Sequence, residues 1–456
     1  MISPSKFYIF ATLKSLVPEL SCTQALSAII MSGFLLQHMF VTSMPITITR
    51  MVTLHNSSNF NWDESQKNDI LGSFFWGHLL FKVPAGRLSE IYGPRMTLGI
   101  AMSLATSVII LTPTLCYLGF YGTLSARLVL GISASFYLPT IPTLIKKWVP
   151  TDEGYKLIVQ LSVVAVFLLL VLGLYGYLIS ILEWDGIFYF IGVVSGIWTT
   201  VWFCFVYNSP EEHPRIRKTE KTQIREALKD KVFFPETRKT PWKDILSSGA
   251  VWACILPFCC ASFSTSLILS QMPTYINQVL HMDAKITGIL INALFLGSHL
   301  TSFFVFYSAD KLIKQKVCSS TTTRKLMSGI LVLVQMLLFL AQSFWGYNHL
   351  LSSVTFTICE PFGNAVMLLY LLSILDVSPN FAGTISGMAT MGGDLTSYLQ
   401  TKIVALCTYD GQDFAHWQSV FFVVVGVHLV GFTSYQVFGS AQVQWWDKKE
   451  GPDGSV

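Results

Sequence analysis

The sequence predicts an all-α membrane protein in which twelve transmembrane helices form two six-helix halves. Its 456 residues are 52% hydrophobic and only 12% charged, whereas about 25% of the residues in ordinary soluble domains are charged. The mean hydropathy is +0.54. Apolar runs that approach the ~20 residues a helix needs to cross ~30 Å of hydrocarbon recur along almost the whole chain. This pattern indicates repeated membrane crossings rather than a single anchor.

Charged residues and clusters of glycine and proline divide the first half of the chain into six apolar runs. The first of these runs lacks a basic flank followed by a small-residue cleavage site, so we expect it to stay in place as a spanning helix. The expected helices cover 25–49, 69–88, 96–117, 119–145, 156–181 and 185–207.

A polar stretch from Ser209 to Leu246 follows the sixth run. It carries ten of the chain's 30 lysines and arginines, mixed with several acidic residues. This composition predicts a basic linker that can form a short helix on the membrane surface. The linker carries no nucleic-acid-binding signature, and we expect no nucleic-acid partner.

Six more apolar runs complete the second half, and they are divided in the same way. We expect helices over 249–277, 286–308, 326–345, 350–375, 381–407 and 414–439. The predicted parts are therefore an N-terminal segment (1–24), an N-terminal bundle (25–208), the linker (209–246), a C-terminal bundle (247–440) and a C-terminal tail (441–456).

The distribution of basic residues orients this arrangement, because lysine and arginine collect in cytoplasmic loops. Placing both termini and the linker in the cytoplasm puts most of the 30 lysines and arginines on that side. The chain has one Asn-x-Ser/Thr sequence, at Asn56, and it falls in the first loop on the predicted outer side. We therefore expect Asn56 to be a glycosylation site.

A loop signature lies between the second and third expected helices. The segment 86–95 reads GRLSEIYGPR, in which Gly86 and Gly93 permit a tight turn and close helix approach, while Glu90 and Arg95 can pair with neighbouring helix ends and close one face. It resembles the loop motif of the major facilitator superfamily. A degraded copy, which includes Asp310, lies at the corresponding place in the second half. The resemblance implies a major facilitator fold with two six-helix pseudo-repeats and a solute site near the membrane midplane.

Further segments resemble the anion:cation symporter family, which is the group of sodium/phosphate cotransporters, sialin and vesicular glutamate transporters (solute carrier family 17). The resemblance extends from about Gly33 to Trp446. It implies transport of phosphate or of an organic carboxylate, coupled to protons or sodium or driven by membrane potential. The segments that carry it are GSFFWG (72–77), PAG (84–86), WDGIFY (184–189), SPEEHP (209–214), PWK (241–243), PTY (273–275), TRK (323–325) and DVSP (376–379).

The family resemblance also locates intramembrane residues that bind anions, and this chain keeps only some of them. Arg127 occupies the position of the fourth-helix arginine. The other positions depart from the family pattern: Val41 replaces the first-helix arginine, Ser43 an asparagine, Ala134 a glutamate, Gly154 an arginine and Thr390 an asparagine. The frame of the family is retained. Because charged positions are lost from it, a cationic or zwitterionic solute is an alternative to an anion.

Ionisable groups inside the expected helices are candidate functional residues, because each costs about 2.5 to 3.5 kcal/mol to insert. Arg127 can hold a carboxylate or phosphate through its planar guanidinium, and His38 is a second candidate for binding the substrate. The alternatives for Arg127 are a structural pair and a side chain that extends toward a membrane interface. For Glu360 the alternative is a permanent pair with Arg127 or with a polar neighbour.

Three residues are candidates for ion coupling. Glu360 precedes Pro361, which can kink the helix at the cavity wall. Asp394 follows two glycines, which favours a packed structural carboxylate as its alternative role. His78 can relay protons. Lys82 lies one turn further on the same helix, and we expect its side chain to extend toward the near membrane surface.

Enzymatic function has little support, since the chain has no metalloprotease His pair, no nucleophile elbow and no phosphate-binding loop. The cysteines, which lack metal-ligand spacing, are interpreted as buried apolar residues, and we expect neither a metal nor a cofactor. Two hypotheses remain: a monomeric secondary transporter in the plasma membrane or in a lysosomal or vesicular membrane, coupled to H+ or Na+, and a transport-inactive membrane receptor or scaffold.

Overall fold

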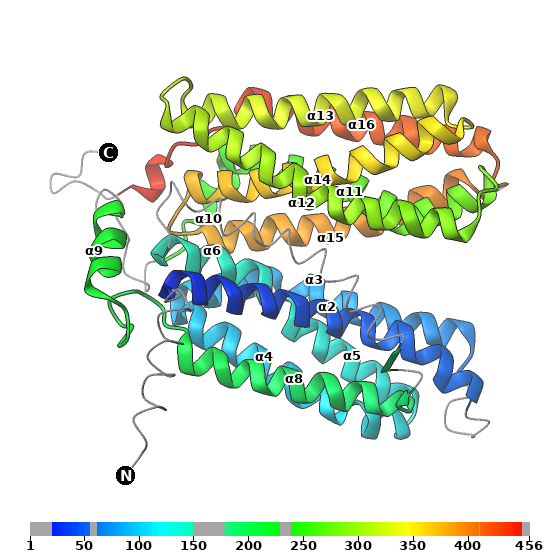
Figure 1. Cartoon of the computed structure of the whole chain (residues 1–456), viewed down its shortest axis with the longest axis horizontal. Coiled ribbons are helices and arrows are strands. Elements are labelled where there is room, and N and C mark those ends of the chain that lie inside the picture. Colours follow the sequence, from blue (N-terminus) through cyan, green and yellow to red (C-terminus); the bar gives the residue numbers. More distant parts are fainter. Residues whose placement is uncertain are drawn as a thin grey trace, which may run out of the picture.

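The computed structural model describes residues 21–54, 62–148, 177–178, 181–228, 239–409 and 411–448. Within these ranges the regular structure is helical throughout. Figure 1 shows two bundles that lie side by side with their helices roughly parallel to one long axis. One bundle comes from the N-terminal half of the chain and the other from the C-terminal half.

The N-terminal bundle follows the expected spans closely. The fifth expected span, 156–181, lies almost wholly outside the described residues. The described helices are α2 (Cys22–Leu54), α3 (Glu64–Tyr92), α4 (Pro94–Tyr117), α5 (Phe120–Ala134), α6 (Tyr137–Trp148) and α8 (Trp184–Phe205).

The expected fourth span is not one continuous helix. It is divided into α5 and α6 by a turn at Ser135 and Phe136. Pro139 has no backbone N–H, so the carbonyl of Ser135, four residues earlier, loses its helical donor. The missing bond explains why the helix is interrupted at this point.

The described residues of the linker and of the C-terminal half also form helices. The linker forms α9 (Lys218–Ala227) and α10 (Trp242–Ser247), and a short 3-10 helix η2 (Trp445–Asp447) ends the described chain. The bundle helices are α11 (Gly249–Gln278), α12 (Ala284–Lys314), α13 (Ser320–Trp345), α14 (His349–Val377), α15 (Ala382–Cys407) and α16 (Phe414–Phe438).

Nine stretches of the described residues are helical, long and apolar enough to cross a membrane. Eight of them are α2, α4, α8, α11, α12, α13, α14 and α16, and the ninth is α5 together with α6. The helices α3 and α15 do not belong to this group. The two bundles meet mainly where α3 contacts α15, and α6 also packs against α15. Both α3 and α15 carry polar side chains at their contact.

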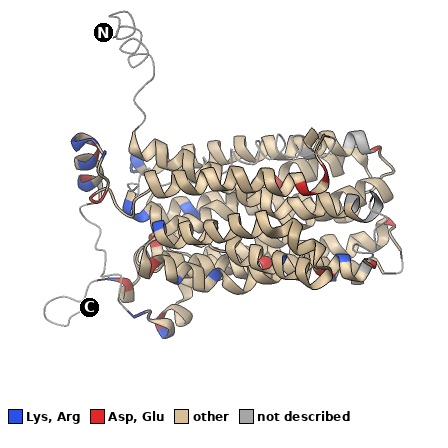
Figure 2. Cartoon of the chain, turned by 90° about the horizontal axis from the view of Figure 1, so that it is seen from below, with Lys and Arg blue, Asp and Glu red and all other residues tan. Residues whose placement is uncertain are grey.

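One end of the molecule carries the first residues of α2, the linker helix α9 and η2, and we call it the termini end. Glu220 of α9 accepts hydrogen bonds from the backbone N–H groups of Cys22 and Thr23, at 3.2 and 3.0 Å. The N–H of Gln444 donates to the carbonyl of Val377, where α14 ends. Figure 2 shows that lysine and arginine gather at this end, while few charged residues lie along the helices.

Glycines let α3 and α15 approach each other until their backbones touch. A Cβ atom on Gly86 would lie 2.1 Å from the carbonyl oxygen of Gly383, and a Cβ on Gly387 would lie 2.5 Å from the carbonyl oxygen of Lys82. No side chain larger than hydrogen fits at either place. This close contact fixes the register in which polar residues of the two halves face each other.

Candidate substrate and coupling site

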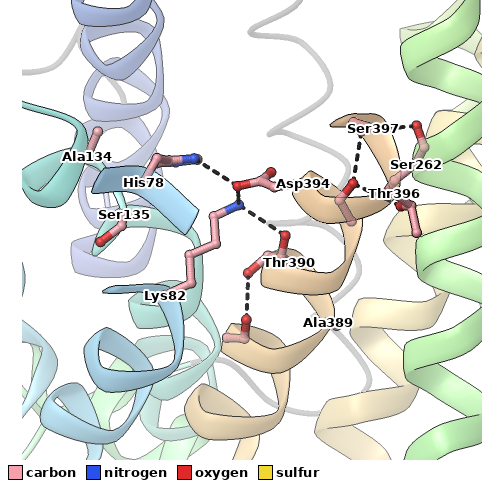
Figure 3. A network of polar contacts seen from close by, with 12 residues as sticks. His78, Lys82, Ala134, Ser135, Ser262, Ala389, Thr390, Asp394, Thr396 and Ser397 are labelled. Carbon is pink, nitrogen blue, oxygen red and sulfur yellow. Dashed lines mark hydrogen bonds and ion pairs between the residues drawn. The ribbon is translucent and has the colours of Figure 1, made fainter. Parts of the chain in front are cut away.

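A cluster of three charged or titratable side chains joins the halves where α3 and α15 cross. Asp394 of α15 receives His78 Nδ1 at 3.0 Å and Lys82 Nζ at 2.7 Å, both on its Oδ2 atom. Lys82 also donates to the carbonyl of Thr390, at 3.2 Å. Figure 3 shows the two side chains of α3 converging on this one carboxylate. One carboxylate oxygen of α15 therefore binds two side chains of α3, a helix of the other half.

The contacts of His78 with Asp394 and with Gln37 of α2 both place its proton on Nδ1. The Nε2 amide group of Gln37 donates to the carbonyl of Ala134 at 3.2 Å, which orients the amide. The same Nε2 lies 3.4 Å from His78 Nε2 and can only donate to it. His78 Nε2 is then the acceptor, so Nδ1 carries the hydrogen that is donated to Asp394.

Arg127 lies in the interior of the N-terminal bundle and binds backbone rather than a carboxylate. Its two terminal nitrogens donate to the carbonyls of Phe40 and Val41, at 3.0 and 3.4 Å. Pro45 interrupts the hydrogen-bond ladder of α2, and because it has no N–H, the Val41 carbonyl lacks its usual helical donor. Arg127 supplies that donor, and its guanidinium also lies over the ring of Phe74, 4.7 Å from the centroid.

The positions that depart from the family pattern have taken on other contacts. At Val41, the backbone carbonyl binds Arg127 where a side-chain arginine would be expected. The carbonyl of Ala134 binds Gln37, and that of Thr390 binds Lys82. The hydroxyl of Ser43 donates to the carbonyl of Phe40. Gly154 lies outside the described residues, as does the predicted glycosylation site Asn56.

His38 and Glu360 have partners other than Asp394. His38 packs edge-to-face against Phe34, with ring centroids 4.8 Å apart. Glu360 of α14 is buried within the C-terminal bundle, where it accepts a hydrogen bond from Ser298 of α12. Arg127 and Glu360 thus have separate partners in separate halves, and the sequence-based alternative that the two form a pair does not hold.

The loop motif carries three charged residues, and one of them, Glu90, forms hydrogen bonds with the other half. Glu90 is buried, and its two carboxylate oxygens accept the backbone N–H and the hydroxyl of Thr384, each at 2.7 Å. Arg87 approaches the same carboxylate at 3.1 Å. Glu90 therefore connects α3 to the first turn of α15 at the termini end.

The remaining motif residues act within their own halves. Gly93 has a positive φ of 83° and joins α3 to α4. Arg95 donates to the carbonyl of Phe203 at 2.6 Å, and its guanidinium lies 4.5 Å from the centroid of the Tyr207 ring. Asp310 pairs with Lys314 one turn along α12, at 3.0 Å. The expected latch thus involves Glu90 across the halves, whereas Arg95 stabilises the N-terminal bundle alone.

Lys82 is the member of the cluster that sequence reasoning assigned to another role. It was expected to extend toward the membrane surface, yet its side chain is only 2% exposed and is paired with Asp394. The spacing of four residues between His78 and Lys82, together with an acidic residue in the other half, was the available signal. In the described part of the chain no group of three potential ligands could hold a metal ion.

Comparison with known proteins matches both the fold and the sequence resemblance. A family model described as Major Facilitator Superfamily matches residues 25–399. A putative inorganic phosphate cotransporter of Drosophila ananassae is 28% identical over 85% of this chain and 82% of its own length. Sialin of Homo sapiens is 26% identical over 86% of this chain and 79% of its own length. A solved structure of a proton:xylose symporter superimposes with a TM-score of 0.69 at 13% identity, covering 92% of this chain and 97% of that chain.

Proposed function

Because the chain belongs to the Major Facilitator Superfamily, and within it to the anion:cation symporter family, we propose that it carries a small anion across the membrane by alternating access, coupled to protons. The superfamily consists of transporters rather than enzymes. One relative is named as an inorganic phosphate cotransporter and another is sialin. They support an anion whose charge is carried by phosphate or carboxylate oxygens.

The observation that carries the proposal is the contact of His78 and Lys82 with Asp394. In carriers of this kind the two halves rock about a site near the midplane. The bonds between α3 and α15 must then break and form again in each cycle. An acid and a base that separate during the cycle can exchange a proton with the side to which they are exposed. His78 and Asp394 are accordingly the proposed coupling residues.

The other predicted site residues receive roles that follow from their surroundings. Arg127 of α5 donates to the interrupted backbone of α2 and adds positive potential for the anion. His38 lies on α2, three residues before Val41. Glu360 is the proposed second proton-accepting group in the C-terminal bundle. The termini end is proposed to face the cytoplasm, with Glu90 and the glycines of α3 and α15 as the gate that closes it.

Transport into proteoliposomes tests this function. Uptake of phosphate, urate, sialate, glutamate and a neutral solute is measured while the pH gradient and the sodium gradient are varied independently. We expect uptake of at least one anion that follows the pH gradient and persists without sodium. Uptake that follows only the sodium gradient would contradict proton coupling. The absence of uptake for every solute would favour the receptor or scaffold hypothesis.

A further inference from the structure

Lys82 is more deeply buried than Asp394, whose carboxylate neutralises its charge. The lysine side chain is 2% exposed, whereas 33% of the Asp394 side chain is exposed. A solute that approaches the cluster meets the carboxylate first. The ammonium group becomes available only if that carboxylate moves away or loses its charge.

The ion pair joins two helices that belong to different halves, so movement of the halves strains or breaks it. An ammonium group left alone in the interior carries a large desolvation cost. Another negatively charged oxygen at the position of Asp394 Oδ2 would remove most of that cost. A carboxylate or phosphate oxygen of a solute has the required charge and accepts the same hydrogen bond.

We propose that the transported anion binds directly to Lys82 by taking the place of the Asp394 carboxylate. The inference rests on the proposed function and names the residue that contacts the solute. A proton binds to Asp394, the contact between Oδ2 and Lys82 Nζ breaks, and an oxygen of the anion takes the vacated position. When the anion leaves, Asp394 releases the proton and pairs with Lys82 again. Each cycle thus moves one proton with each anion, and Lys82 stays charged throughout.

Among the described residues around the pair, Lys82 is the cation that displacement of the Asp394 carboxylate would expose. Thr390 contributes only its carbonyl oxygen to Lys82, and the guanidinium of Arg127 is bonded to the backbone of α2. Neutral His78, which accepts from Gln37, donates to the same Asp394 oxygen as Lys82. Titratable and charged groups on the described elements packed around the pair include His78 of α3, His38 of α2, Arg127 of α5, Lys146 of α6 and Cys259 of α11.

Two transport modes of the full-length protein in proteoliposomes separate the roles of the two partners. One is equilibrium exchange of labelled anion without a pH gradient, and the other is accumulation driven by a pH gradient, each measured with inorganic phosphate and with sialate. The Asp394→Asn variant should retain exchange and lose accumulation, because Lys82 stays available while the proton site is gone. The Lys82→Met variant should lose both, with anion affinity weakened roughly ten- to a hundredfold, as expected when a charged hydrogen-bond partner is removed.

Three further variants test whether the charge of Lys82 itself is required. Lys402→Met removes an exposed lysine of α15, the helix that carries Asp394. The Lys402 side chain lies over the ring of Tyr398, and its removal should leave both modes unchanged. Lys82→Arg should retain exchange. The double variant Lys82→Met with Asp394→Asn leaves no unpaired buried charge, so it should fold even if a single variant does not, and it should not exchange either anion.

Two results would overturn the inference while the proposed function stands. One is exchange by Lys82→Met, or by the double variant, with a half-saturation within about twofold of the wild-type value. The other is undiminished accumulation by Asp394→Asn. If the wild-type protein moves neither phosphate nor sialate in either mode, the proposed transport of these anions fails, and the inference fails with it.

Discussion

Glu90 accepts two hydrogen bonds from Thr384, one from its backbone N–H and one from its hydroxyl, each at 2.7 Å. Thr384 lies in the first turn of α15, and Phe381 at the N-cap of that helix provides no side-chain cap. The first N–H groups of a helix need partners from outside the helix and favour a negative charge. The cap of α15 is therefore supplied by the other half, so opening the termini end leaves this helix uncapped.

The Glu90–Thr384 contact should stabilise the closed arrangement measurably. We expect Glu90→Ala to lower the free energy of unfolding by about 1–3 kcal/mol, because it leaves a buried N–H without its acceptor. Thermal unfolding of the purified protein measures this change. Combining Glu90→Ala with Thr384→Val should cost less than the sum of the two single changes. Strict additivity of the two would show that the residues do not interact.

The close approach of α3 and α15 predicts a steric effect at Gly86. A Cβ atom there would lie 2.1 Å from the carbonyl oxygen of Gly383, so Gly86→Ala must push the helices apart. We expect a loss of about 1–3 kcal/mol in stability, as for other overpacked sites, and impaired transport in proteoliposomes. Gly72→Ala on the same helix is the matched control, since nothing lies within 4 Å of its Cβ position. Equal behaviour of the two variants would contradict the role given to Gly86.

The twelve-helix arrangement was predictable because the length of an apolar run is a local property of the sequence. Where residues are described, the structure follows the expected spans from α2 to α16, apart from the turn that divides the fourth span into α5 and α6. The contacts between polar residues were not predictable in the same way. His78 and Asp394 are 316 positions apart, and their helices meet only because glycines on both sides allow it. The prediction for the Lys82 side chain was wrong for the same reason, since its partner Asp394 lies in the other half.

The role of Gln37 in orienting His78 can be tested separately. Replacing Gln37 with Met removes the amide that donates to His78 Nε2, so the imidazole loses one of the two contacts that hold its ring between Gln37 and Asp394. We expect a shifted pH profile of anion uptake with little change in thermal stability. The control is Gln400→Met in the C-terminal bundle, which removes another buried amide, bonded to Ser266. A pH profile identical to that of the wild type would argue against the role of Gln37.

The end of the described chain predicts a pH-dependent contribution to stability. Asp447 of η2 packs at the termini end and accepts a hydrogen bond from the N–H of Asn380, at 3.2 Å. Burial raises the pKa of this carboxyl to about 6, compared with about 3.9 in an unfolded chain. Its protonated form is therefore favoured by folding. The stabilisation is fully present below about pH 4 and is lost as the pH rises through about 6.

Replacing Asp447 with Asn removes this dependence, because an amide does not ionise. The melting temperature of Asp447→Asn, expressed relative to that of the wild type, should therefore rise between pH 4 and pH 6.5 and stay constant above that range. Comparing the two proteins at each pH cancels the titration of the other groups. Asp283→Asn serves as a control, since this carboxylate lies exposed at the N-cap of α12 and makes no side-chain cap bond. A difference between Asp447→Asn and wild type that does not vary with pH would show that Asp447 is ionised equally in the folded and unfolded protein.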